Sequence, residues 1–299
     1  PQAHAMAAAL QPGQVMLLEN IRFRPEEEKN DPAFAKELAS MADIYVNDAF
    51  GTAHRAHAST AGMAAYLPAV CGFLIKKEIT VMGQAMEAPE HPFVAILGGA
   101  KVSEKLLLID KLMETHCDSI LVLGGMSYTF QKALGGSIGD SLCDDKLLYE
   151  MNVLMSKARK LGVNLMIPVD NVVANRFSND ADTNIVSSGD IPDGWMGMDI
   201  GPRTIDIYTG IIERARTVVW NGPAGVFEMP KFAEGTRAIA TAVAHSKGVS
   251  IIGGGDSAAA IDQLGFSRRV THISTGGGAS LEFLQGLELP GIACLEDAD

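Results

Sequence analysis

The sequence lacks the features that mark several common classes of protein. Its four cysteines, Cys71, Cys117, Cys143 and Cys294, are far apart and form no CxxC pair, so their spacing indicates neither a metal site nor a redox site. No uninterrupted apolar run is long enough to span a bilayer, and the start has neither a basic leader nor an initiating Met. We therefore expect a soluble, cytoplasmic protein with reduced thiols, in a chain that begins part-way along a longer one.

Positive charge is also scarce. The 299 residues contain 24 lysines and arginines against 36 aspartates and glutamates, a formal net charge of −12, with no block of five or more basic residues. A surface of this sign repels polyanions, so we expect no nucleic-acid partner. An anionic ligand must then be held by a few locally placed lysines, arginines and backbone N–H groups.

What the sequence does contain is a repeated order of strand, glycine loop and helix. Short apolar runs, most of them ending in glycine, precede segments with apolar residues at helical spacing. The predicted strands are residues 93–97, 119–123, 164–168, 217–220, 249–253 and 270–274. This alternation predicts an α/β fold with a doubly wound, parallel six-stranded sheet of Rossmann-like type. Because ligands of such sheets bind beyond the carboxyl ends of the strands, the glycine loops predict one shared pocket.

The length fits about two domains, and the pattern indicates where they divide. Residues 1–75 are predicted to form a partial N-terminal α/β lobe, with strands at 15–19 and 44–47 and a helix that Asp31 caps. The polar, amphipathic residues 76–92 are predicted to form a connecting helix. We expect residues 93–280 to form the C-terminal lobe, and residues 281–299 to return toward the N-terminal lobe.

Glycines at the starts of two predicted helices indicate a place for an anion. In the run Gly276–Gly278 no Cβ obstructs the unpaired N–H groups of a helix start, although a tight turn explains the triplet equally well. Asp256 follows two glycines at the other helix start. Its carboxylate could hold Mg²⁺, but an Asp in this position, taken alone, is more often an N-cap.

The stretch from Leu97 to Lys105, LGGAKVSEK, adds positive charge. Lys101 lies in the loop and Lys105 follows four residues later, so both can lie on one side of a first helical turn. Lysines at a helix start oppose the helix dipole, which favours an anion nearby. The sequence contains neither GxxxxGK[ST] nor GxGxxG with its acidic residue, so it supports neither a P-loop nor a dinucleotide fold.

Two arginines follow the predicted strands of the first lobe. Arg22 and Arg55 could clamp a phosphate or a carboxylate together, or they could form surface ion pairs with the acidic run 26–28. His54 and His57 flank Arg55 at a spacing that resembles a metal pair. No third ligand lies nearby in the sequence, which counts against a metal there.

Six segments resemble phosphoglycerate kinase, in order and in spacing, along the whole chain. They are LLENIRFRPEEEKNDPAFAKELA, YVNDAFGTAHRAHAST, LGGAKVSEK, WNGPAGVFE, GGGDS and STGGGASLEFL. This family is a two-lobed glycolytic kinase that moves the acyl phosphate of 1,3-bisphosphoglycerate reversibly onto MgADP, giving 3-phosphoglycerate and ATP. The resemblance implies an ATP-binding transferase that uses Mg²⁺, acts as a monomer without stable partners, and closes a hinge between its lobes to expel water.

The resemblance also implies roles for individual residues. Arg22 and Arg55 would bind 3-phosphoglycerate, and Lys101 would stabilise the moving phosphoryl group. Backbone N–H groups of Gly276, Gly277 and Gly278 would meet the same group in flight. Asp256 would hold Mg²⁺ and Glu228 would hydrogen-bond the ribose. The implied nucleotide-binding residues are Gly99, Lys105, Gly124, Gly125, Gly197, Met198, Asn221, Pro223, Val226, Glu228, Gly254, Gly255, Asp256 and Ser257.

The sequence departs from the family pattern in three ways. Relatives have a DxN strand end, an HLGRP loop and further arginines before the point where this chain starts. Glu104 stands where many relatives have Asp, and Leu123 where many have a third glycine, which is expected to reshape the adenine pocket slightly. Two interpretations follow, an active kinase or a nucleotide-binding fragment without turnover. A fragment would expose apolar surface and strand edges in its first lobe. A different nucleotide enzyme, such as a dehydrogenase, is disfavoured by the missing fingerprint.

Overall fold

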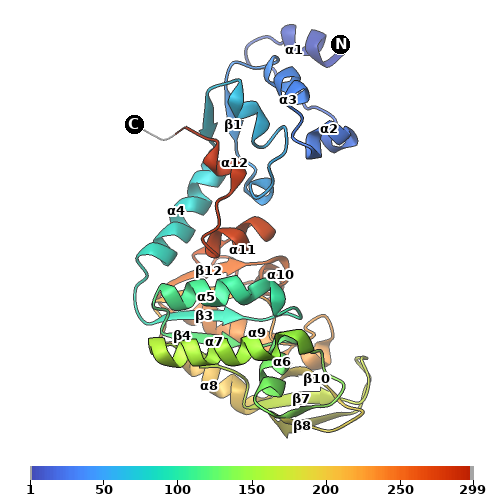
Figure 1. Cartoon of the computed structure of the whole chain (residues 1–299), viewed down its shortest axis with the longest axis vertical. Coiled ribbons are helices and arrows are strands. Elements are labelled where there is room, and N and C mark those ends of the chain that lie inside the picture. Colours follow the sequence, from blue (N-terminus) through green and yellow to red (C-terminus); the bar gives the residue numbers. More distant parts are fainter. Residues whose placement is uncertain (1, 297–299) are drawn as a thin grey trace. The chain divides into compact units, whose positions relative to one another are not determined.

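The computed structural model describes residues 2–296, and these form two compact units (Figure 1). Unit 1 comprises the residues up to Thr80 and those from Gly286 on, and unit 2 is Val81–Gln285. The division lies inside the helix α4 (Phe73–Glu87), on which most of the predicted connecting segment 76–92 falls. The substrate roles given to the two predicted lobes remain predictions.

Unit 2 is built on six parallel strands, which confirms the predicted doubly wound α/β fold. Their order across the sheet is β13-β12-β11-β3-β4-β6. Each predicted strand is present, with small shifts at its ends. The strands are β3 (Phe93–Leu97), β4 (Ser119–Val122), β6 (Asn164–Met166), β11 (Thr217–Asn221), β12 (Val249–Gly253) and β13 (His272–Ile273).

Helices cover both faces of this sheet. In Figure 1, α5 (Leu106–Glu114) and α7 (Leu148–Leu161) lie in front of it. The opposite face is covered by α8 (Pro202–Ile212), α9 (Glu234–His245) and α10 (Gly255–Gln263). They pack against the strands around Trp220, which is fully buried. Burying a large apolar side chain of this kind stabilises a fold by about 1.5–3 kcal/mol. The sheet is therefore held rigidly, and its loops have a fixed base.

A second sheet in unit 2 was not predicted from the sequence. It is antiparallel, in the order β10-β7-β8, and a short parallel pair β5-β9 accompanies it. Its strands contain polar residues such as Asp170, Asn184 and Asp199, so they show no continuous apolar run. The remaining elements of unit 2 are η4 (Ser103–Lys105), α6 (Met126–Ala133), β5 (Ser137–Ile138), η5 (Asp145–Leu147), β7 (Asp170–Ala174), β8 (Thr183–Ser187), β9 (Asp190–Ile191), β10 (Met196–Ile200), η6 (Pro230–Phe232) and α11 (Gly278–Leu284).

Unit 1 contains short helices and a parallel pair of strands. The predicted helix is present as α3 (Pro32–Ala39), and Asp31 caps it by accepting a hydrogen bond from Phe34 N–H at 2.9 Å. The strands are β1 (Tyr45–Asn47), close to the predicted 44–47, and β2 (Ala69–Cys71). The other elements are α1 (Gln2–Ala8), η1 (Ile21–Phe23), α2 (Pro25–Glu28), η2 (Phe50–Thr52), η3 (Gly62–Ala65) and α12 (Pro290–Ala293).

The predicted strand at residues 15–19 is wrong, because this segment is neither strand nor helix. The β1-β2 sheet, among the described residues, offers it no further strand to pair with, and an isolated strand is not stable. Val15 and Leu17 are 93% and 95% exposed. Exposed apolar side chains in the first lobe are among the features that the fragment interpretation predicts.

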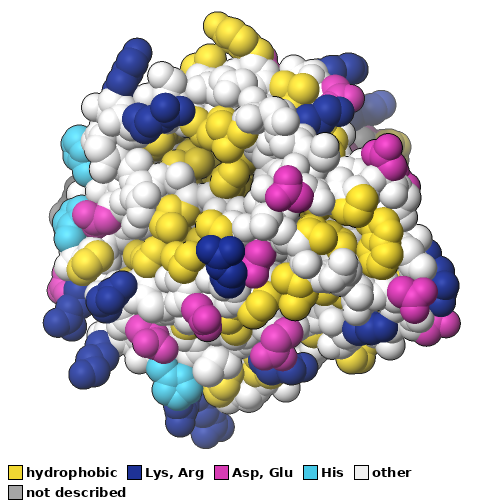
Figure 2. All heavy atoms as spheres, turned by 90° about the horizontal axis from the view of Figure 1, so that it is seen from below, with side chains coloured by type: hydrophobic (Ala, Val, Ile, Leu, Met, Phe, Trp, Pro, Cys, Tyr) yellow, Lys and Arg dark blue, Asp and Glu magenta, His cyan; other side chains and the backbone are white. Residues whose placement is uncertain are grey.

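Positive and negative side chains are intermixed on the face of the molecule that Figure 2 shows. Figure 2 shows lysine, arginine, aspartate and glutamate side chains interspersed with apolar ones on one face of the described structure. Within residues 2–296, no helix is long and apolar enough to cross a membrane.

The glycine loops after β3 and β11 cross each other in direct backbone contact. Gly98 N–H donates to Asn221 O at 2.9 Å, and Gly99 N–H donates to Pro223 O at 3.1 Å. Gly222 has a φ of +99°, and a Cβ there would overlap the carbonyl oxygen of Gly98. Glycine is therefore required at this position by both its backbone conformation and the close approach.

Gly222→Ala should destabilise the protein by on the order of 2 kcal/mol or more, because it adds both strain and a clash. The measurement is urea unfolding at neutral pH. The matched control is Gly210→Ala in the interior of α8, where a Cβ meets nothing within 4 Å. That control should gain about 0.5–1 kcal/mol. Equal changes in the free energy of unfolding for the two substitutions would contradict the close backbone contact at Gly222.

Candidate active site

Two cavities adjoin at the carboxyl edge of the six-stranded sheet. They measure about 500 Å³ and about 250 Å³. Four residues line both of them: Gly99, Ala100, Pro223 and Asp256. The strand order changes direction between β3 and β11, and doubly wound sheets bind ligands at this switch point. The crossing loops thus form a common floor for one extended site.

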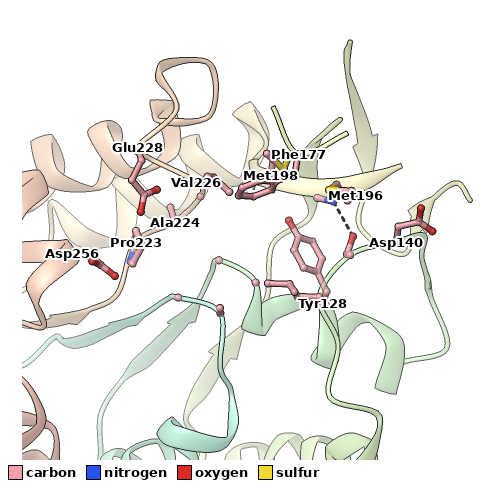
Figure 3. A pocket seen from close by; sticks show the side chains of 18 residues that line it. Tyr128, Asp140, Phe177, Met196, Met198, Pro223, Ala224, Val226, Glu228 and Asp256 are labelled. Atoms are coloured by element: carbon pink, nitrogen blue, oxygen red, sulfur yellow. Dashed lines mark hydrogen bonds between the residues drawn. The ribbon is translucent and has the colours of Figure 1, made fainter. Parts of the chain in front are cut away.

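The larger cavity is mostly apolar and has acidic residues at its ends. Figure 3 shows Asp256 and Glu228 toward one end and Asp140 toward the other, with Val226, Met198 and Phe177 between them. Such an apolar slot with a few polar groups suits a flat organic ring. Of the implied nucleotide-binding residues it brings together Gly99, Gly124, Gly125, Gly197, Met198, Pro223, Val226, Glu228 and Asp256.

Glycines shape this slot for two different reasons. Gly124 has a φ of +66°, and a Cβ on it would meet the backbone N of Gly99 at 2.6 Å. At Gly197 a Cβ would overlap the Tyr128 hydroxyl. By contrast, a Cβ on Gly99 would meet nothing within 4 Å. The first two therefore allow parts of the protein to approach each other, and Gly99 leaves space for a ligand.

The smaller cavity contains the lysines of the site. Its lining includes Lys101, Glu104, Lys105, Asn221, Gly254, Gly255 and Asp256. Two lysines and two carboxylates around open backbone glycines suit a phosphate chain with its cation. The two cavities together therefore offer an apolar slot that continues into a charged one.

Lys105 is buried at the start of α5, with 8% of its surface exposed. Its Nζ donates a hydrogen bond to Oδ1 of Asn221, at the end of β11. Burial lowers the pKa of Lys105 to about 8, although the carboxylates of Glu104 and Asp256 oppose this shift. The ammonium group is thus held in a site that an incoming anion would stabilise further.

Lys101 is placed differently from its neighbour. Its side chain is 73% exposed, and Nζ forms an ion pair with Oε1 of Glu104 at 3.0 Å. The family departure at Glu104 thus gives Lys101 a local partner. Exposed pairs of this kind contribute little stability, so Lys101 can leave Glu104 for a stronger anion.

Asp256 is not the N-cap that its position alone favours. Gly254 is the N-cap of α10, and Asp256 lies in the first turn. Its carboxylate is exposed and forms no hydrogen bond or ion pair with any described residue. The structure between residues 2 and 296 contains no group of three or more His, Cys, Asp or Glu side chains that could hold a metal by themselves. A single carboxylate can, however, bind Mg²⁺ when phosphate oxygens of a ligand supply further ligands to the metal.

Four implied site residues, Ser257 and Gly276–Gly278, do not line either cavity. Ser257 is fully buried, and its Oγ accepts a hydrogen bond from Gly222 N–H at 2.7 Å, so it supports the crossing loop. Gly276 N–H donates to Ser274 Oγ at 3.2 Å, and Gly276–Gly278 line neither of the two cavities. Leu123 is buried in the core of the sheet and does not itself line the slot, so its expected effect on the adenine pocket remains a prediction.

The two arginines lie in unit 1. Arg22 lines a separate cavity of about 590 Å³ there, and the exposed Arg55 donates from Nε to His54 Nε2 at 3.3 Å. The alternative ion pairs with residues 26–28 are not seen in the described part of the chain, where Arg24 pairs with Glu26. Both arginines are therefore free of carboxylate partners among these residues.

Sequence reasoning missed most of the far wall of the slot. Tyr128 in α6, the Asp140–Leu142 turn, Phe177 and Met196 all line it. Ser141 Oγ accepts a hydrogen bond from Gly197 N–H at 2.8 Å, which ties this turn to β10 (Figure 3). None of these residues belongs to a glycine loop. Tyr128 reaches the site from α6, and the unpredicted second sheet and the β5-β9 pair bring the others.

Comparison with known proteins identifies the family. The family model described as phosphoglycerate kinase matches residues 1–287. The chain belongs to the phosphoglycerate kinase family. The phosphoglycerate kinase of Moorella thermoacetica is 56% identical over 297 residues, which cover 99% of this chain and 75% of that relative. The enzyme of Clostridium tetani is also 56% identical, over 95% of this chain and 71% of that relative.

Solved structures of the family have the same fold. The phosphoglycerate kinase from Coxiella burnetii matches with a TM-score of 0.90 and 44% identity, over 96% of this chain and 74% of that one. The phosphoglycerate kinase from Pyrococcus horikoshii OT3 matches with a TM-score of 0.83 and 34% identity, over 98% of this chain and 75% of that one.

The lowered pKa of Lys105 predicts a pH-dependent contribution to stability. Between about pH 8 and pH 10.5 the unfolded state holds a proton that folded Lys105 has lost, so the free energy of unfolding rises with pH. Lys105→Met should remove this rise, which is at most about 3 kcal/mol. Urea unfolding of both proteins from pH 7 to 10.5 measures the difference. A difference that stays constant over this range would contradict the buried, destabilised ammonium group.

Proposed function

We propose that this chain catalyses reversible phosphoryl transfer between 1,3-bisphosphoglycerate and MgADP, giving 3-phosphoglycerate and ATP. The family supplies the reaction, and the pair of adjoining cavities supports the placement of the nucleotide. The proposed setting is a monomer in the cytoplasm.

The observation that carries the placement is that an apolar slot continues into a charged cavity over shared glycines. The base would lie in the larger cavity, between Met198 and Val226 on one side and the Gly124–Gly125 loop on the other. Glu228, at the end where the cavities adjoin, would hydrogen-bond the ribose. The phosphates would lie in the smaller cavity, with Lys105 and the backbone of Gly254 and Gly255 around them.

Asp256 would hold Mg²⁺ together with phosphate oxygens, because its carboxylate forms no hydrogen bond or ion pair with any described residue. Bound there, Mg²⁺ would neutralise charge on the phosphates. Lys105 would add its positive charge from a buried position, where an ammonium interacts more strongly with an anion than in water. Ser257 would act indirectly, by holding the loop at Gly222.

The transferring group needs charge stabilisation more than covalent help. Lys101 would leave Glu104 and bind the phosphoryl group as its charge develops. The N–H groups of Gly277 and Gly278, which lie at the start of α11, would meet the same group. In unit 1, Arg22 and Arg55 would bind the acid substrate, and closure of the hinge remains a prediction of the family resemblance.

A coupled assay with ATP and 3-phosphoglycerate on the 299-residue chain tests the proposal, together with calorimetry of MgADP binding. We expect both turnover and nucleotide binding. MgADP binding without turnover would contradict catalysis by this chain. Absence of nucleotide binding would contradict the placement of the nucleotide at the glycine loops.

Lys101→Ala should lower kcat by about 100-fold or more, because it removes a charge that acts mainly on the transition state. The Kd for MgADP should change by less than about threefold, since the ground-state partner of Lys101 is Glu104. The matched control is Lys111→Ala, which breaks a similar pair with Glu114 three residues away on α5, outside both cavities. Equal losses in kcat and affinity for Lys101→Ala would instead make it a ground-state ligand.

A further inference from the structure

A buried carboxylate that the proposed reaction does not use lies directly beside the base cavity. Asp199 is in β10, is 2% exposed, and follows Met198, which lines the cavity. The register of β10 against β7 shifts between Gly197 and Asp199, so Met198 lies outside the regular pairing. Bulges of this kind redirect side chains and are frequent next to active sites.

Both oxygens of this carboxylate accept backbone hydrogen bonds. Oδ2 accepts from Gly235 N–H at 2.7 Å, and Oδ1 accepts from Ile200 N–H at 2.9 Å. Gly235 lies in the first turn of α9, and the N-cap residue of that helix, Ala233, has no side chain that could cap it. Asp199 therefore caps α9 from a strand of the second sheet.

Loop 222–228, which carries Pro223, Val226 and Glu228, is held between the same two elements. Val226 N–H donates to Met198 O at 2.9 Å, and Ala224 N–H donates to Thr236 Oγ1 of α9 at 3.0 Å. A Cβ on Gly225 would overlap Oδ1 of Asp199, so the loop backbone passes directly over the carboxylate. Asp199 thus joins the strand, the helix and the loop that together form one wall of the base cavity.

The ionisation of Asp199 adds to this geometric case. Burial raises its pKa to about 7, against the effect of the two N–H donors. A carboxylate with a raised pKa contributes stability that is present at low pH and is lost as the pH rises through 7. The fold thus keeps a carboxylate that destabilises it above neutral pH, which indicates a role other than stability.

The other titratable groups near Asp199 come from four elements. Tyr128 and Glu234 act on it electrostatically from α6 and α9. Loop 222–228 carries Glu228, and β7 carries Asp170 at its start.

We propose that Asp199 is a positioning residue for the nucleotide, and that its carboxylate holds loop 222–228 and the β10 bulge in the geometry that binds the base. This inference rests on the proposed function, because it assigns the larger cavity to the base. The residue touches no substrate. Its effect on binding is transmitted through Gly235, Gly225 and Met198.

Asp170 provides a matched control in the same sheet. It is also buried, at 3% exposure, and its oxygens accept hydrogen bonds from Arg203 N–H at 3.0 Å and Thr204 N–H at 2.8 Å, in the first turn of α8. It therefore caps a helix from a strand just as Asp199 does. It lines neither cavity, and α8 carries no residue of the slot.

The experiment compares Asp199→Asn and Asp170→Asn by calorimetry with MgADP, by thermal unfolding and by steady-state kinetics. Asn keeps the shape but presents an N–H₂ group to one of the two donors. We expect Asp199→Asn to raise the Kd and the KM for the nucleotide about 10-fold, the cost of leaving one buried N–H unpaired, with kcat within about threefold. Asp170→Asn should lower Tm as well but leave the nucleotide Kd unchanged.

Two results would overturn the inference. One is an unchanged nucleotide Kd in Asp199→Asn, and the other is an equal loss of affinity in both variants, which would indicate general loosening of the fold. If the unmodified chain binds no MgADP, the proposed function fails and this inference fails with it. Tight binding by the unmodified chain and by Asp199→Asn alike would overturn the inference alone.

A second measurement needs no variant, in case Asp199→Asn does not fold. Adenosine has no phosphate to titrate, and its Kd for the unmodified chain can be measured from pH 6 to pH 8. Protonation turns one acceptor oxygen of Asp199 into a donor, so we expect adenosine to bind at least about threefold more weakly at pH 6 than at pH 8. An equal Kd at both values would overturn the proposal.

Discussion

The crossing of two glycine loops at the switch point of the sheet is the constraint on which the site depends. The backbones after β3 and β11 touch at Gly98 and Gly222, where no Cβ fits. Because this contact fixes the loops against each other, the residues that follow, Lys105 on one side and Pro223 on the other, have defined positions. The fully buried strands beneath give these loops a rigid base.

Two charged groups close to these loops, Lys105 and Asp199, are buried at a cost in stability. The Nζ of Lys105 is buried and donates a hydrogen bond to the amide oxygen of Asn221, and its pKa is lowered. Asp199 is buried beneath the neighbouring wall with a raised pKa. Both groups would be poor choices for stability alone. With a nucleotide placed as proposed, its phosphates would stabilise Lys105 directly, and Asp199 would act through the surrounding backbone.

Much of the fold was predictable because its signals are local. Apolar runs such as Phe93–Leu97 are long enough to be buried on both faces, and the glycines that follow them mark the loops. The strand predicted at residues 15–19 failed because pairing partners decide strand formation, and these are not local. The second sheet was missed because polar residues such as Asp170 and Asp199 interrupt its strands, which therefore show no apolar run.

Part of the candidate site was also predictable from the sequence, and part was not. The loops containing Gly99, Gly124 and Gly254 were predictable, whereas Phe177 and Met196 reach the slot only through the second sheet. The central claim is that one site extends across both cavities, and a crystal structure of this chain with MgADP tests it most directly. We predict density for the base between the Gly124–Gly125 loop and the wall formed by Met198 and Val226, with the phosphates beside Lys105 and the metal on Asp256. A nucleotide bound elsewhere, or phosphates outside the cavity that contains Lys105, would contradict it.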